Sequence, residues 1–265
     1  MKKNLDIRIK NEEELLTLRE AGVILARILE YTKRSLKPGI TTREIDLIVE
    51  SLIKQENVLP AFKGYRGFPA CSCISINEEI VHGIPGERVV KNGDIVSIDV
   101  GIIYRSYYSD MAVTIAAGEL SASSQKLLDV TRQALYKGIS QARVGGRLGD
   151  ISHAIQTYAE SKGFSVVRDF VGHGIGQKLH EDPEIPNYGH AKTGPVLKTG
   201  MVFAIEPMLN MGGYKTKTLK DGWTVITADH KPSAHFEHTI AITEQGPVIL
   251  TDCSTTTMTG LSSES

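Results

Sequence analysis

Apolar residues recur at the spacing of amphipathic helices in the N-terminal part of the chain. The sequences Asn11-x-x-Glu14 and Thr41-x-x-Glu44 are capping boxes, so each predicts the start of a helix. A serine-rich segment starts a third predicted helix, and Asp150 is expected to cap a fourth. The predicted helices run over residues 11–35, 41–55, 121–142 and 150–162.

Short runs rich in β-branched and aromatic residues predict strands between the second and third helices. The last two strands are expected to pair across a tight turn at Tyr104-Arg105, which places Asp99 and Asp110 directly opposite each other on one face. Because like charges at that distance repel, we expect a compensating charge nearby. The predicted strands lie near residues 71–76, 80–82, 94–103 and 108–115, and an aromatic loop covers residues 56–75.

The order of elements occurs twice along the chain, which indicates two related halves. Residues 90–99 match residues 197–206, and the turn at Gly39 matches the turn at Gly145 at nearly the same shift. His82-Gly-Ile-Pro likewise echoes His173-Gly-Ile-Gly. We therefore expect a single domain over residues 1–257, with repeats over about 11–118 and 121–250 and a flexible tail over 258–265.

The repeat gives each acid of the hairpin a counterpart in the second half. Glu206 corresponds to Asp99 and Glu237 corresponds to Asp110, so four carboxylates are expected to meet at the axis between the halves. Their neighbours are apolar, and carboxylates in such strands are rarely buried unless they are paired or bind a metal. Two divalent ions would neutralise the set. With a nitrogen from His173, this oxygen-rich site suits Mn²⁺, Fe²⁺, Co²⁺ or Zn²⁺.

Composition narrows the classes of function. Of the 265 residues, 41% are hydrophobic and 23% are charged, and the net charge of −1 gives no broad basic surface for DNA or anionic membranes. No apolar run is long enough to span a bilayer, and no apolar signal core follows the basic N-terminus. The three cysteines lack zinc-site spacing and indicate buried or free thiols in a reducing cytosol. We therefore expect a cytoplasmic protein that binds neither DNA nor membranes.

Seven short motifs contain these residues and several others. They are Ile-Asn-Glu-Glu-Ile-Val-His82-Gly-Ile-Pro, Ser-Ile-Asp99-Val-Gly, Ser-Asp110-Met-Ala, Gly-His173-Gly-Ile-Gly, His180-Glu-Asp-Pro, Ala-Ile-Glu206-Pro-Met and Phe-Glu237-His-Thr. Together they resemble the type I methionine aminopeptidases in their short bacterial form, over roughly residues 10–250. The resemblance implies the α+β pita-bread fold, with pseudo-two-fold halves, an antiparallel sheet and two helix pairs.

The resemblance also implies the ligands of a dinuclear metal centre. Asp110 and Glu237 would bridge two divalent ions, and a hydroxide shared by the ions would attack the carbonyl of the first peptide bond. The implied metal ligands are Asp99, Asp110, His173, Glu206 and Glu237. A further, monovalent cation would bind near Asn77, Glu79 and Ser233.

Three residues would take part in catalysis by the same resemblance. His180 would stabilise the carbonyl oxygen, His82 would contact the scissile amide, and Glu206 would move the proton of the attacking water. His82 and His180 would also flank the substrate beside an apolar methionine pocket. The residues implied to line that pocket are Phe62, Tyr65, Phe68, Cys73 and Trp223. Leu179 and Phe62 depart from residues common in the family, which leaves the shape of the pocket open.

Two further histidines lie close to Glu237 in the sequence. Strand alternation places His235 on the same face as Glu237, so its role is left open, whereas His238 is expected to face away and pack. The remaining histidines, His153, His190 and His230, are interpreted as solvent-exposed or packing residues.

The implied activity is the removal of N-terminal methionine from nascent polypeptides whose second residue is small. The resemblance implies a monomer, with the ribosome as a candidate partner. One alternative is a hydrolase related to X-Pro aminopeptidases or prolidases, but residues 1–10 leave no room for the extra N-terminal domain those enzymes carry. A second is a binding protein of the same fold without catalysis, which is expected to have lost metal ligands. A type II enzyme would need a helical insertion between His180 and Glu237, for which the interval is too short.

Overall fold

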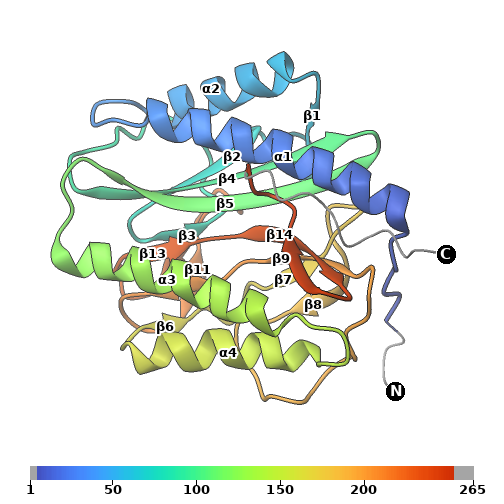
Figure 1. Ribbon diagram of the computed structural model, residues 1–265. Coiled ribbons are helices and arrows are strands. Elements are labelled where there is room, and N and C mark those ends of the chain that lie inside the picture. The colour runs from blue at the N-terminus through green and yellow to red at the C-terminus, as the bar shows by residue number, and fades with distance from the viewer. Residues whose placement is uncertain (1–4, 254–265) are drawn as a thin grey trace.

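Two helix pairs lie on opposite sides of the β-strands (Figure 1). The computed structural model describes residues 5–253, so the predicted tail over residues 258–265 lies outside the described part. The helices are α1 (Glu12–Ser35), α2 (Thr42–Gln55), α3 (Ala122–Gln141) and α4 (Leu148–Ser161), and a short 3-10 helix, η1, spans Tyr65–Gly67.

Local capping explains where these helices begin. Both predicted capping boxes are confirmed, because the side chains of Asn11 and Thr41 accept hydrogen bonds from the third residue of α1 and α2. The prediction that Asp150 caps α4 is wrong. Asp150 lies inside the first turn, and its carboxylate accepts from the backbone N–H of Arg147, the residue before the helix. An acidic residue is favourable there because it faces the positive end of the helix dipole.

All strand pairs within the described residues are antiparallel, which confirms the predicted α+β class. In the first sheet β4 lies between β1 and β2 and also pairs with β5, and the five-stranded sheet has the order β15-β14-β9-β7-β8. Two small sheets have the orders β13-β10-β6 and β11-β12-β3. The strands of the first half are β1 (Leu59–Pro60), β2 (Ser72–Ile76), β3 (Glu79–Val81), β4 (Asp94–Tyr104) and β5 (Tyr107–Ala117). Those of the second half are β6 (Ser165–Val166), β7 (Gly172–Gly174), β8 (Glu181–Ile185), β9 (Val202–Ile205), β10 (Met208–Asn210), β11 (Thr216–Thr218), β12 (Val225–Thr227), β13 (Ser233–His235), β14 (His238–Thr243) and β15 (Gly246–Ile249).

The β4–β5 hairpin turns one residue later than predicted. Its turn residues are Arg105 and Ser106, both with positive φ (45° and 68°), as a two-residue hairpin turn requires. Asp99 therefore pairs with Ala112 and Asp110 pairs with Gly101. The two acids are diagonal neighbours on one face of the hairpin, not directly opposite each other.

The second half repeats this arrangement with a wider connection. β9 pairs with β14, and their register brings Glu206 and Glu237 to the same end of the paired strands. This placement corresponds to that of the two aspartates on the paired strands β4 and β5. The sequence echo between His82 and His173 does not reflect equivalent places. His173 lies in β7, beside β9, whereas His82 follows β3 in a loop and has a φ of 59°.

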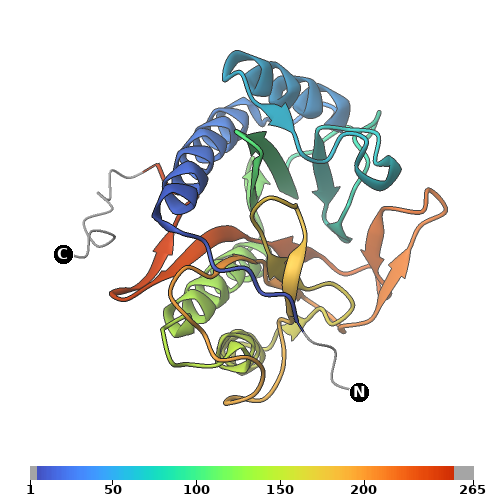
Figure 2. The ribbon, with the colours of Figure 1, turned by 90° about the vertical axis from the view of Figure 1, so that its right-hand side faces the viewer.

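Each helix pair covers its own buried cluster. Leu25 and Ile28 of α1 share a cluster with Ile98 of β4, whereas Ile151 of α4 belongs to another cluster with Phe203 of β9. The segment before α1 reaches the second half of the chain, where the Lys10 backbone N–H donates to the carbonyl of Gly200 (Figure 2). None of the helices in residues 5–253 is long and apolar enough to cross a membrane.

Replacing Phe203 with alanine is expected to lower the free energy of unfolding by about 3–5 kcal/mol, because this ring is 1% exposed and leaves a cavity beside Ile240. Urea denaturation measures the change. The control is Leu47→Ala on α2, where the side chain is 55% exposed and a change within about 0.5 kcal/mol is expected. Equal losses in the two variants would contradict this placement of the core.

Candidate metal centre

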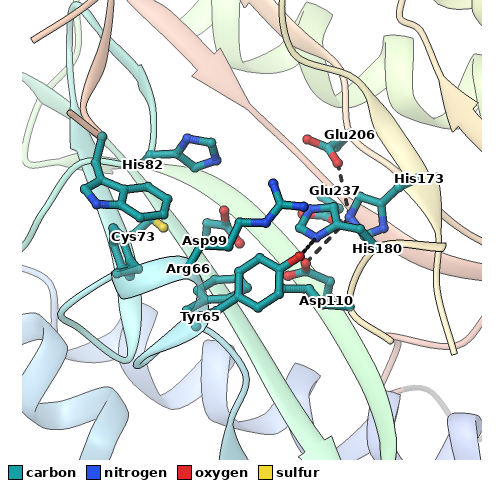
Figure 3. Close-up of a pocket in the computed structure, with 14 residues that line it drawn as sticks. Tyr65, Arg66, Cys73, His82, Asp99, Asp110, His173, His180, Glu206 and Glu237 are labelled. Atoms are coloured by element: carbon teal, nitrogen blue, oxygen red, sulfur yellow. Dashed lines mark hydrogen bonds and ion pairs between the residues drawn. The ribbon is translucent and has the colours of Figure 1, made fainter. Parts of the chain in front are cut away.

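Five side chains that the sequence predicts as metal ligands meet between the two halves (Figure 3). Asp99 and Asp110 come from β4 and β5, His173 from β7, Glu206 from the residue after β9, and Glu237 from the residue before β14. Strands and their ends therefore position every one of these groups. The structure brings all five into the lining of a single cavity.

The distances within this group suit a metal site. The Nε2 atom of His173 lies 3.6 Å from Oε1 of Glu206 and 3.9 Å from Oδ2 of Asp110. Ligand atoms of Asp110, His173 and Glu237 all lie within 4.8 Å of one another. Carboxylate oxygens with one imidazole nitrogen form a donor set that divalent transition metals accept.

A backbone contact fixes the tautomer of His173. Its Nδ1 atom lies 2.9 Å from the carbonyl oxygen of Gly174, so Nδ1 carries the proton and donates it. The lone pair of Nε2 is then free and faces the carboxylates, as in a metal-binding histidine. Burial lowers the pKa of His173 to about 4, so the ring is neutral.

Two glycines let β7 come close to its neighbours. A Cβ atom at Gly172 would lie 2.4 Å from the carbonyl oxygen of Ala204, and one at Gly174 would lie 2.2 Å from that of Asp182. Any larger residue would push β7 away from β8 or β9. The glycines on both sides of His173 therefore set the position of its ring.

The carboxylates cannot all be ionised without a cation. Burial, followed by the charges of neighbouring carboxylates, raises the pKa values of Asp110, Glu206 and Glu237 well above their ordinary range. Burial also raises the pKa of Asp99 to about 7. Oδ1 of Asp99 and Oε1 of Glu237 are buried without a hydrogen-bond partner. Unsatisfied carboxylate oxygens that face one another fit a site for divalent cations.

Hydrogen bonds between the halves hold the ligands in register. The hydroxyl of Thr239 donates to the carbonyl of Asp110 (2.7 Å) and accepts from its backbone N–H (3.2 Å). The backbone N–H of Glu237 donates to the carbonyl of Ala112 at 2.9 Å. These bonds join β5 to the start of β14, at the point where Asp110 and Glu237 lie.

His235, whose role the sequence left open, points at the metal ligands. It is 2% exposed, and its Nε2 atom lies 3.9 Å from Oε2 of Glu206 and 3.9 Å from Oε2 of Glu237 without a hydrogen-bond partner. Burial lowers its pKa to about 3. His238 faces away as predicted, where its Nδ1 atom lies 2.9 Å from the hydroxyl of Thr251.

His82 and His180 line the same cavity from opposite sides. His180 shares a 2.8 Å hydrogen bond between its Nδ1 atom and the hydroxyl of Tyr65, and its ring centroid lies 4.3 Å from that of His173. His82 packs edge-on against Trp223 and Phe170. Burial lowers the pKa to about 4 for His82 and, with the neighbouring charges, to about 3 for His180, so both rings are neutral.

An apolar pocket adjoins the ligands. The cavity has a volume of about 150 Å³, and the rings of Phe68 and Trp223 meet edge-on there with centroids 5.1 Å apart. Burial raises the pKa of Cys73 far above its usual range, which keeps the thiol neutral and apolar. All the residues expected to form this pocket are brought together: Phe62, Tyr65, Phe68, Cys73 and Trp223, with Leu179 beside them. Arg66, which the sequence reading did not single out, also lines the cavity.

The model of metallopeptidase family M24 matches residues 17–244. The chain belongs to this family. The methionine aminopeptidase 1 of Bacillus subtilis is 57% identical to it over 242 residues, which cover 91% of this chain and 98% of the relative. The methionine aminopeptidase of Clostridium perfringens is 54% identical, with 92% and 98% covered.

Solved structures of similar peptidases agree with this assignment. The methionine aminopeptidase of Rickettsia prowazekii matches with a TM-score of 0.92 at 44% identity, covering 93% of this chain and 100% of that one. A prolidase from Pyrococcus horikoshii has a TM-score of 0.76 at 25% identity, and only 64% of that chain is covered. The predicted pita-bread fold and the resemblance to methionine aminopeptidases are confirmed, and the X-Pro alternative is not favoured.

Without metal, this M24 chain is expected to become less stable as the pH rises from about 6.5 to 8. The buried carboxylates keep protons that the unfolded chain has lost, because their pKa values are raised. The native state then binds more protons, so the free energy of unfolding falls by up to about 1.4 kcal/mol per pH unit for each retained proton. The buried histidines act in the opposite direction, below pH of about 6.5, where the unfolded imidazoles become charged.

Urea denaturation of chelator-treated protein at several pH values measures this slope. Asp99→Asn removes one of the titrating groups, so its slope should be shallower, and added Mn²⁺ should restore stability at pH 8. A stability that is flat or rises over this range would contradict the buried, uncompensated carboxylates.

Proposed function

We propose that the protein removes the N-terminal methionine from polypeptides whose second residue is small. The observation that carries the proposal is a neutral apolar pocket directly beside five converging metal ligands. Relatives named as methionine aminopeptidases, which match over nearly their whole length, support it. The activity is that of a metal-dependent exopeptidase, a hydrolase.

The proposed metal centre holds two divalent ions on Asp99, Asp110, His173, Glu206 and Glu237. Four carboxylates bring a charge of −4 when ionised, which two divalent cations neutralise and one does not. The single imidazole among oxygen donors favours manganese, iron, cobalt or zinc. Such ions supply Lewis acidity and lower the pKa of water, which makes a nucleophile available at neutral pH.

The proposed catalytic residues act on the two ends of the scissile bond. The hydroxyl of Tyr65 holds His180 through Nδ1, so the other nitrogen of its neutral ring is aimed into the cavity and donates to the carbonyl oxygen as charge develops. His82, on the opposite side, hydrogen-bonds the amide nitrogen. Glu206 accepts the proton of the attacking water and passes it to the leaving amine.

Pocket shape gives the substrate preference. A flexible, unbranched methionine side chain fits the space between Phe62, Phe68 and Trp223, where its sulfur makes favourable contacts with the rings. The second side chain of the substrate must lie between the two histidines and the ligands. These walls are fixed by the chemistry and cannot retreat, so only a small residue fits there.

The wider setting of the proposal rests on the resemblance. We propose a single catalytic domain that acts as a cytoplasmic monomer on nascent polypeptides, with the ribosome as a candidate partner and without DNA. The Asn77 carbonyl accepts from the Ser233 backbone N–H at 2.8 Å, and these residues with Glu79 are the proposed site of a monovalent cation.

Peptide cleavage tests the proposed substrate class. Met-Ala-Ser should be cleaved well, whereas Met-Leu-Ser, Leu-Ala-Ser and Ala-Pro-Ser should be cleaved weakly or not at all. A bulky second residue displaces the scissile carbonyl, and a shift of about 1 Å can cost about 10²-fold in rate. Liquid chromatography of the products under one metal condition gives the rates. Preference for Ala-Pro-Ser would replace this proposal with an X-Pro aminopeptidase, and equal rates for the two methionyl peptides would refute the steric argument.

Replacing His180 with alanine should lower kcat by about 10²–10³-fold while both metals still bind, because this residue contacts substrate and no metal. Titration calorimetry with Mn²⁺ measures binding, and steady-state kinetics measures kcat. The matched variants are Asp110→Ala and Glu237→Ala, in which binding at both metal sites should change. Loss of metal in the His180 variant would show that it is a ligand, and two unchanged sites in the matched variants would refute bridging.

A further inference from the structure

Arg66 is held in an uncommon backbone conformation beside the cavity that the candidate metal ligands line. It lies in η1 with φ 49° and ψ 24°, the left-handed region that residues with a Cβ rarely adopt. Gly64 and Gly67, on its two sides, both have φ of 88°. The turn is closed by hydrogen bonds from the Gly64 N–H to the Phe68 carbonyl (2.8 Å) and from the Phe68 N–H to the Tyr65 carbonyl (2.9 Å). This closed turn determines where the Arg66 side chain leaves the backbone.

The side chain stands where two cavities meet. The cavity lined by the candidate metal ligands adjoins an open cleft of about 420 Å³. Both are lined by Arg66, His173 and His180. Figure 3 shows the guanidinium group of Arg66 reaching toward these two histidines. A substrate that places its methionine in the apolar pocket and its first peptide bond at the candidate metal ligands must continue through the open cleft. The residue after the small second one therefore passes Arg66.

Arg66 carries a charge that no contact within the described part of the chain neutralises. No carboxylate of residues 5–253 lies within ion-pair distance of its guanidinium, which instead lies 5.3 Å from the centre of the Tyr65 ring. Two of the four acidic residues that line the cleft are engaged elsewhere. Glu181 pairs with the buried Lys10 at 2.6 Å, and Asp182 accepts from the backbone N–H of Asp6 at 3.0 Å.

The positive charge of Arg66 acts on His180, which lines the same cavity. After burial and the neighbouring ring of His173, the positive charge of Arg66 is the next cause that lowers the pKa of His180. Because Arg66 also lines both cavities, its guanidinium lies close to the point where the substrate chain would leave the ligands. An anionic group on the substrate at that point would meet a cation that has no ion-pair partner among the described residues.

We infer that Arg66 binds a carboxylate on the peptide just beyond its small second residue, so that substrates with Asp or Glu as the third residue are preferred. This inference rests on the proposed aminopeptidase function. A guanidinium group matches a carboxylate through two parallel N–H···O bonds, which an ammonium group cannot reproduce. The same chemistry is offered by an acidic side chain or by the terminal carboxylate of a tripeptide.

The expected size of the preference follows from exposure. Arg66 is exposed, so its pairing with a carboxylate is screened by solvent, and the preference should be about two- to five-fold in kcat/KM. It should shrink as salt is added, because exposed charge pairs are screened within about 10 Å at 0.1 M salt.

Competition between two amidated peptides, Met-Ala-Glu-Ser and Met-Ala-Gln-Ser, tests the inference in one reaction mixture. The ratio of their kcat/KM values, read by mass spectrometry, should be about two to five for the unchanged protein. Arg66→Gln should bring the ratio to about one, and Arg66→Lys should retain part of it. A second pair, Met-Ala-Gln with a free or an amidated terminus, separates a terminal carboxylate from a side-chain carboxylate.

Arg105→Gln is the matched control. Arg105 is also an exposed arginine with positive φ (45°), but it lies in the β4–β5 turn and pairs with Glu20 at 3.1 Å. This variant has the same change in net charge and should keep the ratio of the unchanged protein.

Each outcome is decisive. A ratio of one in the unchanged protein, or a ratio that survives Arg66→Gln, would overturn the inference. A preference confined to the free terminus would overturn the part that concerns side chains. Failure to cleave even Met-Ala-Gln-Ser would instead refute the proposed aminopeptidase function, so the two failures are distinguishable.

Discussion

The convergence of four carboxylates, two of them buried and two partly buried, at the seam between two halves is the constraint on which the rest of the structure depends. Each acid enters from a strand or its end, and the strands are tied across the seam by the hydroxyl of Thr239 and by the Glu237 backbone. Such a cluster is tolerable when its members hold protons or cations. The neutral imidazoles around it, His173 and His235 among them, add nitrogen atoms without adding positive charge that would compete with a metal.

Two kinds of structural element, strands and loops, position the side chains around this seam. The candidate ligands stand on paired strands or at their ends, whereas most of the groups proposed to meet the substrate stand on loops held by particular contacts. Tyr65 links the η1 turn to His180, and the buried Lys10–Glu181 pair ties the segment before α1 to the residue after His180. Substrate preference can therefore change through the loops while the strands keep the metal-binding geometry, since different contacts fix the two parts.

Local sequence patterns predicted many of the elements of this protein, and the features that they missed have identifiable physical causes. Capping boxes fixed the starts of α1 and α2, because their hydrogen bonds lie within four residues. The hairpin turn was predicted one residue too early, which displaced the predicted partner of Asp99 by two residues, because Arg105 and Ser106 are not residue types typical of a left-handed turn. Strand alternation placed His235 on the face of Glu237, but its approach to Glu206 and the place of Arg66 depend on segments far away in the sequence, so local patterns could not reveal them. The candidate ligands were predicted from the resemblance and the repeat together.

The distribution of the ligands along the chain has a consequence for the order of folding events. The interval from Asp99 to Glu237 covers more than half of the chain, and Glu237 reaches its place when β14 has docked on β5. Contacts between such distant segments form slowly, because loop closure costs entropy before it is compensated. As the chain is synthesised, the β4–β5 hairpin emerges with two carboxylates and without its partners. Binding of metal ions by all of the candidate ligands would therefore mark the completion of the tertiary structure and could not initiate it.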